Sequence, residues 1–298
     1  MRLDDEQEST NIEDRRGQGG GFNLPGMGGG LGFGGRGLSL GTIAIVIVVA
    51  LVFGINPLTL LGGGGPSAPP AEQIGQPQQP ASAARPASET DSFVAKVLRT
   101  TERSWETIFA TEIGQPYEAP RLVLFTGDVQ SACGAAESAM GPFYCPADKK
   151  VYLDQRFFDD LSRRFGAPGD FAAAYVIAHE VGHHVQNLLG ISGQAQQAQQ
   201  RASKTRANAI SVRVELQADC FAGVWAKDNA GRLEPGDVEE ALRAATAIGD
   251  DTLQKAAQGV VVPESFTHGS SAQRTRWFMR GMTGGTVAGC DTFAAQEI

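Results

Sequence analysis

The sequence predicts an α+β domain that is mostly helical with a small sheet, preceded by one N-terminal transmembrane helix. Three observations support this fold class. A dense apolar run lies within residues 38–61, strand-like segments lie at residues 120–127 and 150–154, and helical patterns fill much of the remaining chain. The net charge of −8 at pH 7 argues against a nucleic acid as a partner.

The first 61 residues divide into a polar tail and an apolar segment. Residues 1–37 mix charges of both signs with glycine runs, a composition typical of a disordered tail. Residues 38–61 lie within a stretch that is free of charge from Arg36 to Glu72, and they are long enough to cross a hydrocarbon layer of about 30 Å. A secretory signal peptide is the alternative. The run begins far from Met1 and lacks a small-x-small cleavage site, so we expect an uncleaved anchor.

Basic residues predict the orientation of this anchor. Several arginines precede the apolar run, whereas the first basic residue after it is Arg85. The positive-inside rule then places the N-terminus in the cytoplasm. We therefore expect a single-pass protein of the cytoplasmic (inner) membrane. Residues 62–90, rich in Gly, Pro, Gln and Ala, form a linker to a periplasmic or extracytoplasmic domain at residues 91–298.

Helical spacing from Phe93 to Phe109 predicts the first helix of this domain, and the two strand-like segments follow. The next predicted helix starts with Asp170 as its cap and contains an H-E-x-x-H motif that begins at His179. His179 and His183 are four residues apart and share one helix face, so both imidazoles can bind a single zinc ion. Glu180 points about 100° away and can act as general base on a water beside the metal.

A second helical segment supplies the third candidate ligand. Glu215 and Asp219 are four residues apart, on one face. Zinc sites that cleave peptides commonly use two histidines and one glutamate, which assigns one zinc ion per chain to His179, His183 and Glu215. A ligating histidine usually donates its other ring N–H to a carboxylate, and Asp219 is the candidate for that role. Alone, E-x-x-x-D is typical of a solvated helix face; downstream of H-E-x-x-H it indicates a metal site.

These motifs resemble those of known zinc proteases. H-E-x-x-H followed by E-x-x-x-D is similar to the signature of thermolysin-like zincins, and E-L-Q-A-D is close to the form found in membrane-bound CAAX-processing and heat-shock zinc proteases. The whole chain resembles the bacterial "putative neutral zinc metallopeptidase" family. The segments that carry the resemblance are E-D-R-R-G from Glu13, the apolar run, H-E-V-G-H-H-V-Q from His179, E-L-Q-A-D-C from Glu215 and T-H-G-S-S from Thr267. The resemblance implies a zincin-like domain that hydrolyses peptide bonds.

The resemblance also implies two further roles. Thr267-His268 resembles the Thr-His-Pro segment of the CAAX-type enzymes, with Gly269 in place of proline, so we expect His268 to stabilise an oxyanion. A capping or solvent-exposed histidine is the alternative. Residues 151–154 lie where zincins often have an edge strand that pairs with an extended substrate. An ordinary edge strand is the alternative there.

The remaining candidate residues have less specific signals. Four cysteines allow three pairings, and without a C-x-x-C spacing we do not expect them to bind zinc. Outside the cytoplasm disulfides are plausible, and we expect Cys133–Cys145 and Cys220–Cys290. His184 lies on a different helix face from His183, which favours a structural role. Arg274 and Arg276 can each hold Asp219, orient a carbonyl group or pair with surface acids.

The sequence therefore predicts a membrane-anchored zinc-dependent peptidase that acts on a peptide or protein, with Glu180 as base. Three alternatives stay open. The chain can be a catalytically silent, zinc-stabilised binding or scaffold module, for which Glu180 has no use. It can be a membrane-tethered interaction protein whose tails carry the function. It can also be another zinc-dependent amide hydrolase, because the motif specifies an activated water and not the substrate.

Overall fold

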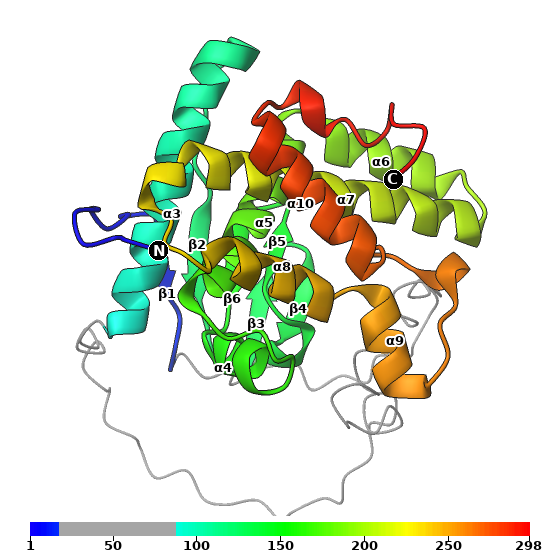
Figure 1. Cartoon of the computed structure of the whole chain (residues 1–298), viewed down its shortest axis with the longest axis horizontal. Coiled ribbons are helices and arrows are strands. Elements are labelled where there is room, and N and C mark those ends of the chain that lie inside the picture. The colour runs from blue at the N-terminus through cyan, green and yellow to red at the C-terminus, as the bar shows by residue number, and fades with distance from the viewer. Residues whose placement is uncertain (18–87) are drawn as a thin grey trace, which may run out of the picture.

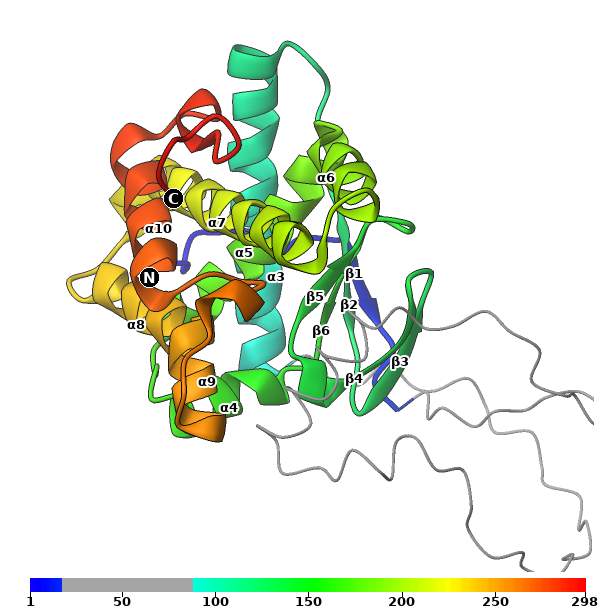
Figure 2. The same cartoon turned by 90° about the vertical axis from the view of Figure 1, so that its right-hand side faces the viewer.

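The computed structural model describes residues 1–17 and 88–298, and the fold is given for these ranges. Its centre is formed by two long helices, α5 (Asp170–Leu188) and α7 (Lys204–Asp228). Figures 1 and 2 show α5 between a small sheet on one side and α7, α8 and α10 on the other. Because α5 is covered on both sides, its apolar run from Phe171 to Ala178 is buried in the main core.

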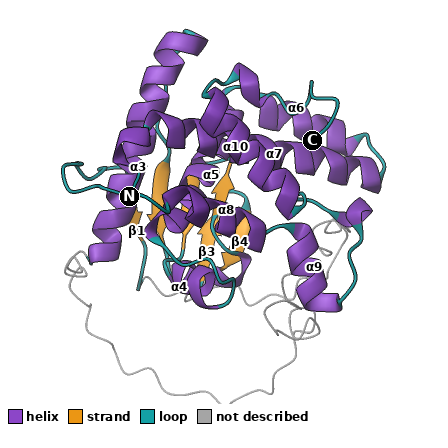
Figure 3. Ribbon diagram, viewed as in Figure 1, coloured by secondary structure: helices purple, strands orange, loops and turns teal. Residues whose placement is uncertain are grey.

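Helices dominate the described chain, as Figure 3 shows. The predicted first helix is α3, which begins after a capping box between Ser88 and Asp91. A second capping box, between Ser270 and Gln273, begins α10. The helices besides α5 and α7 are α3 (Glu89–Ile108), which continues into a π-helical turn at Phe109–Ile113, α4 (Arg156–Arg163), α6 (Ile191–Gln200), α8 (Asp237–Ala247), α9 (Asp250–Gln258) and α10 (Ser271–Gly284).

The main sheet has the strand order β1-β2-β6-β5. Strands β1 (Ile12–Asp14), β2 (Arg121–Leu124) and β6 (Lys150–Leu153) are parallel, and β5 (Phe143–Cys145) is antiparallel to β6. A hairpin of β3 (Asp128–Ser131) and β4 (Gly134–Glu137) lies beside it. Both strands expected from the sequence are present as β2 and β6. The expected disulfides Cys133–Cys145 and Cys220–Cys290 are also present.

The expected edge position of residues 151–154 is wrong. β6 lies between β2 and β5, so its backbone groups are already paired on both sides. The edge strand near α5 is instead β5, whose position the sequence did not indicate. The start of α5 also differs slightly, because Gly169, with φ +124°, occupies the cap position and Asp170 is the first helical residue.

The expectation of a disordered N-terminal tail is wrong for residues 1–17, which pack on the domain. β1 adds to the sheet beside β2, and the buried carboxylate of Glu102 in α3 accepts hydrogen bonds from Ser9 and Asn11. At the end of this segment Arg16 donates to Asp91, in the first turn of α3, at 2.6 Å. The polar residues of the tail therefore find partners that its composition alone does not indicate.

The prediction of a single-pass membrane protein, with a cytoplasmic tail and an external domain, is also corrected. One span would place residues 1–37 and 91–298 on opposite sides of a bilayer, whereas β1 and β2 share one sheet. None of the helices formed by the described residues has the length and apolarity needed to cross a membrane. The expected span at 38–61 and nearly all of the expected linker at 62–90 lie outside the described residues.

Candidate metal centre

The crossing of α5 and α7 creates the candidate metal centre. Gly182 of the H-E-x-x-H motif faces Ala218, and a Cβ atom at position 182 would lie 3.0 Å from the Ala218 carbonyl oxygen. The missing side chain lets the two helices approach closely, which brings the His179 and His183 side chains of α5 next to Glu215 of α7. A larger residue at position 182 would push the third candidate ligand away from the other two.

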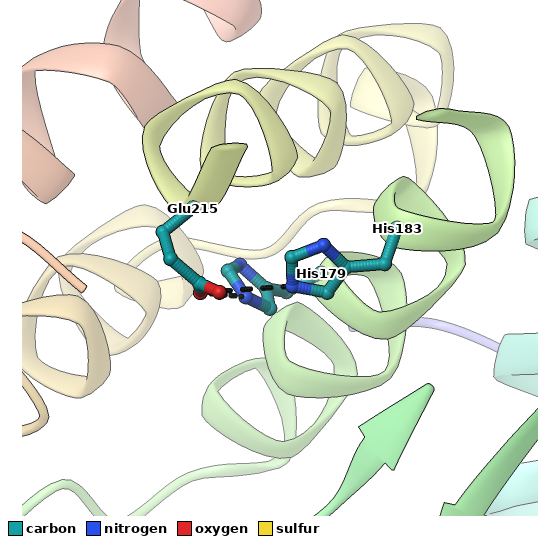
Figure 4. Close-up of side chains that lie close together, drawn as sticks. All are labelled: His179, His183 and Glu215. Atoms are coloured by element: carbon teal, nitrogen blue, oxygen red, sulfur yellow. Dashed lines mark hydrogen bonds and ion pairs between the residues drawn. The ribbon is translucent and has the colours of Figure 1, made fainter. Parts of the chain in front are cut away.

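The three predicted ligands converge on one point. His179, His183 and Glu215 each offer one ligand atom, and these atoms lie within 4.8 Å of one another. Glu215 Oε2 is 3.2 Å from His179 Nε2 and 3.6 Å from His183 Nε2, as drawn in Figure 4. Two imidazole nitrogens and one carboxylate oxygen are a donor set that suits zinc and leaves a fourth tetrahedral position for water. The residues present therefore fit the ion that the sequence predicts.

The Nδ1 atoms of His179 and His183 make hydrogen bonds away from the point where the ligand atoms meet. His179 Nδ1 lies 2.8 Å from Asp219 Oδ1, and His183 Nδ1 lies 2.9 Å from Gln186 Oε1. Since both oxygens accept, each ring carries its proton on Nδ1 and presents the Nε2 lone pair to the shared point. The predicted orienting role of Asp219 thus agrees with its position. Gln186 was not predicted, although its place three residues after His183 puts it on the same helix face.

Asp219 is itself fixed by two buried side chains. Arg274 Nε donates to Asp219 Oδ2 at 2.9 Å, and the Tyr175 hydroxyl donates to Asp219 Oδ1. Burial raises the pKa of Asp219, but the Arg274 and His179 charges outweigh burial and lower it below its usual value. Of the two arginines considered from the sequence, Arg274 therefore holds Asp219, whereas Arg276 is exposed.

The electrostatics of the cluster favour a cation. Burial lowers the pKa of His179, but the Asp219 carboxylate outweighs burial and raises the pKa to about 10. Burial also lowers the pKa of His183, but the Glu215 carboxylate outweighs burial and raises that pKa above its usual value. The carboxylates thus create a negative potential at the two Nε2 atoms. A divalent ion would satisfy the same potential and would compete with protons for these nitrogens.

Glu180 lies in the same cavity as the three candidate ligands. It lines a 560 Å³ cavity together with His179, His183 and Glu215, although only 7% of its surface is exposed. Burial raises the pKa of Glu180 above its usual value, which makes its carboxylate a better proton acceptor near neutral pH. No side chain or backbone group of the described residues hydrogen-bonds to this carboxylate.

His268 lines the same cavity and is held by Asp250, a residue that the sequence did not single out. Asp250 Oδ1 lies 3.2 Å from His268 Nδ1, and Asp250 Oδ2 accepts the backbone N–H groups of residues 267–269. These hydrogen bonds fix the loop before α10, and no group of residues 1–17 or 88–298 hydrogen-bonds to His268 Nε2. Asp250 precedes His268 by eighteen positions in the sequence, and their contact depends on how α9 packs against α10.

His184 is structural. Its Nδ1 lies 3.0 Å from the Tyr144 hydroxyl, and its Nε2 lies 2.6 Å from the Glu118 carbonyl oxygen. Both ring nitrogens are therefore engaged away from the candidate metal ligands. Burial lowers the pKa of His184 to about 4, so the ring is neutral at pH 7. Because Tyr144 belongs to β5, His184 also fixes the edge strand against α5.

The chain matches one family model and several bacterial proteins. The family model described as "Putative neutral zinc metallopeptidase" matches residues 1–293. Protein YpfJ of Escherichia coli (strain K12) is 48% identical over 295 residues, which cover 98% of this chain and 99% of YpfJ.

A second relative aligns with a shorter part of the chain. Protein Rv2575 of Mycobacterium tuberculosis (strain H37Rv) is 48% identical over 195 residues, which cover 61% of this chain and 65% of Rv2575. No solved structure matches the chain. The family match and the relative that spans nearly the whole chain show that this protein belongs to the family described as "Putative neutral zinc metallopeptidase".

Proposed function

We propose that this protein is a zinc-dependent peptidase. The observation that carries the proposal is the convergence of His179 Nε2, His183 Nε2 and Glu215 Oε2 beside Glu180, whose carboxylate has no hydrogen-bond partner among the described residues. A zinc ion at this point would act as a Lewis acid and make a water molecule acidic at neutral pH. A closed structural zinc site has no need for a free carboxylate next to its ligands.

Each protein group has one task in the proposed reaction. Glu180 takes a proton from the attacking water and later gives it to the leaving amine. Burial lowers the pKa of His268, but the carboxylates of Asp250 and Glu215 outweigh burial and raise it above its usual value. The ring, protonated on both nitrogens and held by Asp250 through Nδ1, donates a hydrogen bond from Nε2 to the carbonyl oxygen as negative charge develops there. Asp219 holds His179 in the tautomer that leaves its Nε2 available.

The cavity supports an extended peptide as the substrate. β5 is one of the two edge strands of the main sheet, and its residues Phe143 and Tyr144 line the cavity beside His179 and Glu180. A free strand edge offers backbone hydrogen bonds to any peptide in extended conformation, independent of its sequence. Phe157 and Phe165 add an apolar wall that side chains of the peptide can contact.

The test compares the full-length wild type with the variants Glu215→Ala and Glu180→Gln. We expect one zinc per chain in the wild type and in Glu180→Gln, and little in Glu215→Ala, measured by metal analysis after zinc-replete purification. Cleavage of a mixture of quenched fluorescent peptides should fall by a factor of about 10²–10⁴ in Glu180→Gln, because the base is lost.

Two results would contradict the proposal. A wild-type protein that binds no zinc would remove the metal site. A protein that binds zinc but cleaves no peptide, with Glu180→Gln indistinguishable from wild type in every assay, would favour a zinc-stabilised binding module.

A further inference from the structure

We propose that two buried glutamines, Gln186 and Gln217, position His183 for the metal and link it to the Cys290 carbonyl group, which the Cys220–Cys290 disulfide holds against α7. We name this hydrogen-bonded path from His183 to Cys290 the glutamine relay. The inference rests on the proposed metal site, and it concerns how one ligand of that site is held.

The contacts of the relay are continuous. Gln186 Oε1 lies 2.9 Å from His183 Nδ1, and Gln186 Nε2 donates to Gln217 Oε1 at 3.0 Å. Gln217 Nε2 in turn donates to the Cys290 carbonyl oxygen at 3.1 Å. Gln186 and Gln217 are 0% and 3% exposed, so water does not compete for these groups.

Backbone carbonyl groups set the direction of the relay. Gln186 Nε2 also donates to the Val214 carbonyl oxygen at 2.7 Å. A carbonyl oxygen can only accept, so the NH₂ groups of Gln186 and Gln217 must face Val214 and Cys290 respectively. The amide oxygen of Gln186 is then turned toward His183, and it can only accept the Nδ1 proton. This leaves the Nε2 lone pair of His183 for the metal.

The relay also joins the elements that carry the ligands. Gln186 and His183 belong to α5, whereas Val214 precedes Glu215 in α7. A single side chain therefore couples the orientation of one ligand to the backbone position of another. At His179 a charged carboxylate has the orienting role. At His183 the neutral amide of Gln186 has the orienting role. This amide keeps its oxygen toward the ring only because its NH₂ group is held by partners of its own.

The far end of the relay is fixed to α7. Cys290 is bonded to Cys220. The Thr292 hydroxyl donates to the Arg213 carbonyl oxygen, and the Arg213 side chain donates back to the Thr292 carbonyl oxygen. The C-terminal segment is thereby held along α7, which keeps the Cys290 carbonyl group within reach of Gln217. Without the disulfide, this acceptor would have only the neighbouring hydrogen bonds to hold it.

The test measures the zinc dissociation constant of the full chain by competition with a chromophoric chelator. In Gln186→Leu the constant should rise by about 10–100-fold, the usual effect of losing a partner of a ligating histidine. Gln217→Leu should raise it by a smaller factor of about 3–10, because Gln186 keeps its bond to Val214. As a control, Gln254→Leu removes a glutamine that is 8% exposed and has hydrogen bonds of its own, to Val262 and Ser265. It should leave the constant unchanged.

A conservative variant separates positioning from simple packing. In Gln186→Glu the carboxylate still accepts from His183 Nδ1 but cannot donate to Val214 or Gln217. We expect its melting temperature to fall, yet its zinc dissociation constant should stay below that of Gln186→Leu. Gln217→Glu places the same charge one step further from His183. It should weaken zinc binding, because it cannot donate to Cys290, and this result excludes a general effect of added negative charge.

The two disulfides provide a matched pair. Cys220→Ser/Cys290→Ser should weaken zinc binding, whereas Cys133→Ser/Cys145→Ser should not, because the hairpin loop makes no bond to the relay. If the first pair of substitutions prevents folding, Gln217→Leu tests the same link with the disulfide intact.

The outcomes distinguish the relay from the proposed function. If the wild type binds zinc and Gln186→Leu binds it equally well, or if Gln186→Glu is weaker than Gln186→Leu, the relay is refuted and the peptidase proposal stands. If zinc binding responds as expected but no peptide is cleaved, the relay stands and the peptidase proposal fails. A wild type that binds no zinc overturns both.

Discussion

Some residues of the candidate metal centre could be predicted from the sequence, and others could not. His179 and His183 were predicted from spacing, because helix periodicity alone puts residues four apart on one face. Glu215 was predicted from its E-x-x-x-D motif downstream of H-E-x-x-H and from the usual ligands of peptide-cleaving zinc sites. Asp250 and Gln217 were not predicted, since each acts on a residue that is distant in sequence or on another element. Spacing identified the ligands within one helix and Asp219 as the partner of a histidine, whereas the contacts of Asp250 and Gln217 form only after the helices have packed.

His184 leads to a prediction on pH dependence. Its pKa is about 4 in the folded protein, against 6.5 for an exposed histidine. As the pH falls from 6.5 to 4, the unfolded chain takes up a proton that the folded protein does not, so the free energy of unfolding should decrease, by about 3 kcal/mol in total. In His184→Gln, which keeps an acceptor for Tyr144 and a donor for Glu118, this acid-induced loss should be smaller by about that amount.

The measurement is urea unfolding of wild type and His184→Gln at pH 7, 6, 5 and 4.5, in the same metal state. The other histidines are present in both proteins, so the difference between the two curves isolates position 184. If the free energy of unfolding depends on pH equally in both proteins, His184 takes up its proton as readily in the folded protein as in the unfolded chain and is not buried as described.

At the scale of elements, two close helix crossings build the centre. α5 meets α7 at Gly182, and α7 meets α10 at Gly223 and Gly281, where an added Cβ would overlap the backbone of the facing helix. The second crossing places Arg274 of α10 against Asp219 of α7. The orientation of His179 therefore depends on a glycine contact between two helices that do not contain it.

Gly281→Ala tests this dependence. The new methyl group would overlap the Cys220 carbonyl oxygen and force α7 and α10 apart, which should lower the free energy of unfolding by about 1–3 kcal/mol or more. Gly284→Ala, in the last turn of the same helix, has no heavy atom within 4 Å of the new methyl group and should be neutral or slightly stabilising. Urea unfolding of both variants measures the difference, and similar values for the two would show that the crossing tolerates a larger separation.

At the scale of the whole molecule, residues 1–17 form part of the domain. Arg16 connects them to the start of α3 through Asp91, and both side chains are 11% exposed. Burial raises the pKa of Asp91, but its hydrogen bonds, that from Arg16 foremost, outweigh burial and hold the pKa well below its usual range. The ion pair thus joins two segments that are separated by residues 18–87 in the sequence.

Arg16→Ala should lower the free energy of unfolding by about 1.5–3 kcal/mol at pH 7, the usual size for a hydrogen bond to a charged group. Because the folded pKa of Asp91 is depressed, this contribution is present above pH 3.8 and is lost as the pH falls below it. The exposed Arg276→Ala is the control and should change stability by less than about 0.5 kcal/mol. Equal stabilities of Arg16→Ala and wild type in urea unfolding would show that the N-terminal segment is not docked in solution.

The sequence by itself determined the local features of this protein. Helix periodicity determined the relation of His179, Glu180 and His183, and the pattern of apolar residues predicted a mostly helical domain with strands at β2 and β6. The sequence wrongly predicted a disordered, cytoplasmic N-terminal tail, because a charged, glycine-rich composition is typical of disorder until its partners in the fold are known. It also misplaced the sheet edge, because strand order is not a local property. Only the tertiary structure shows these two features. It alone also shows the contact of Asp250 with His268, the hydrogen bonds of the glutamine relay and the docking of β1. In each case at least one stabilising partner lies far away in the chain, and only packing brings it within hydrogen-bonding distance.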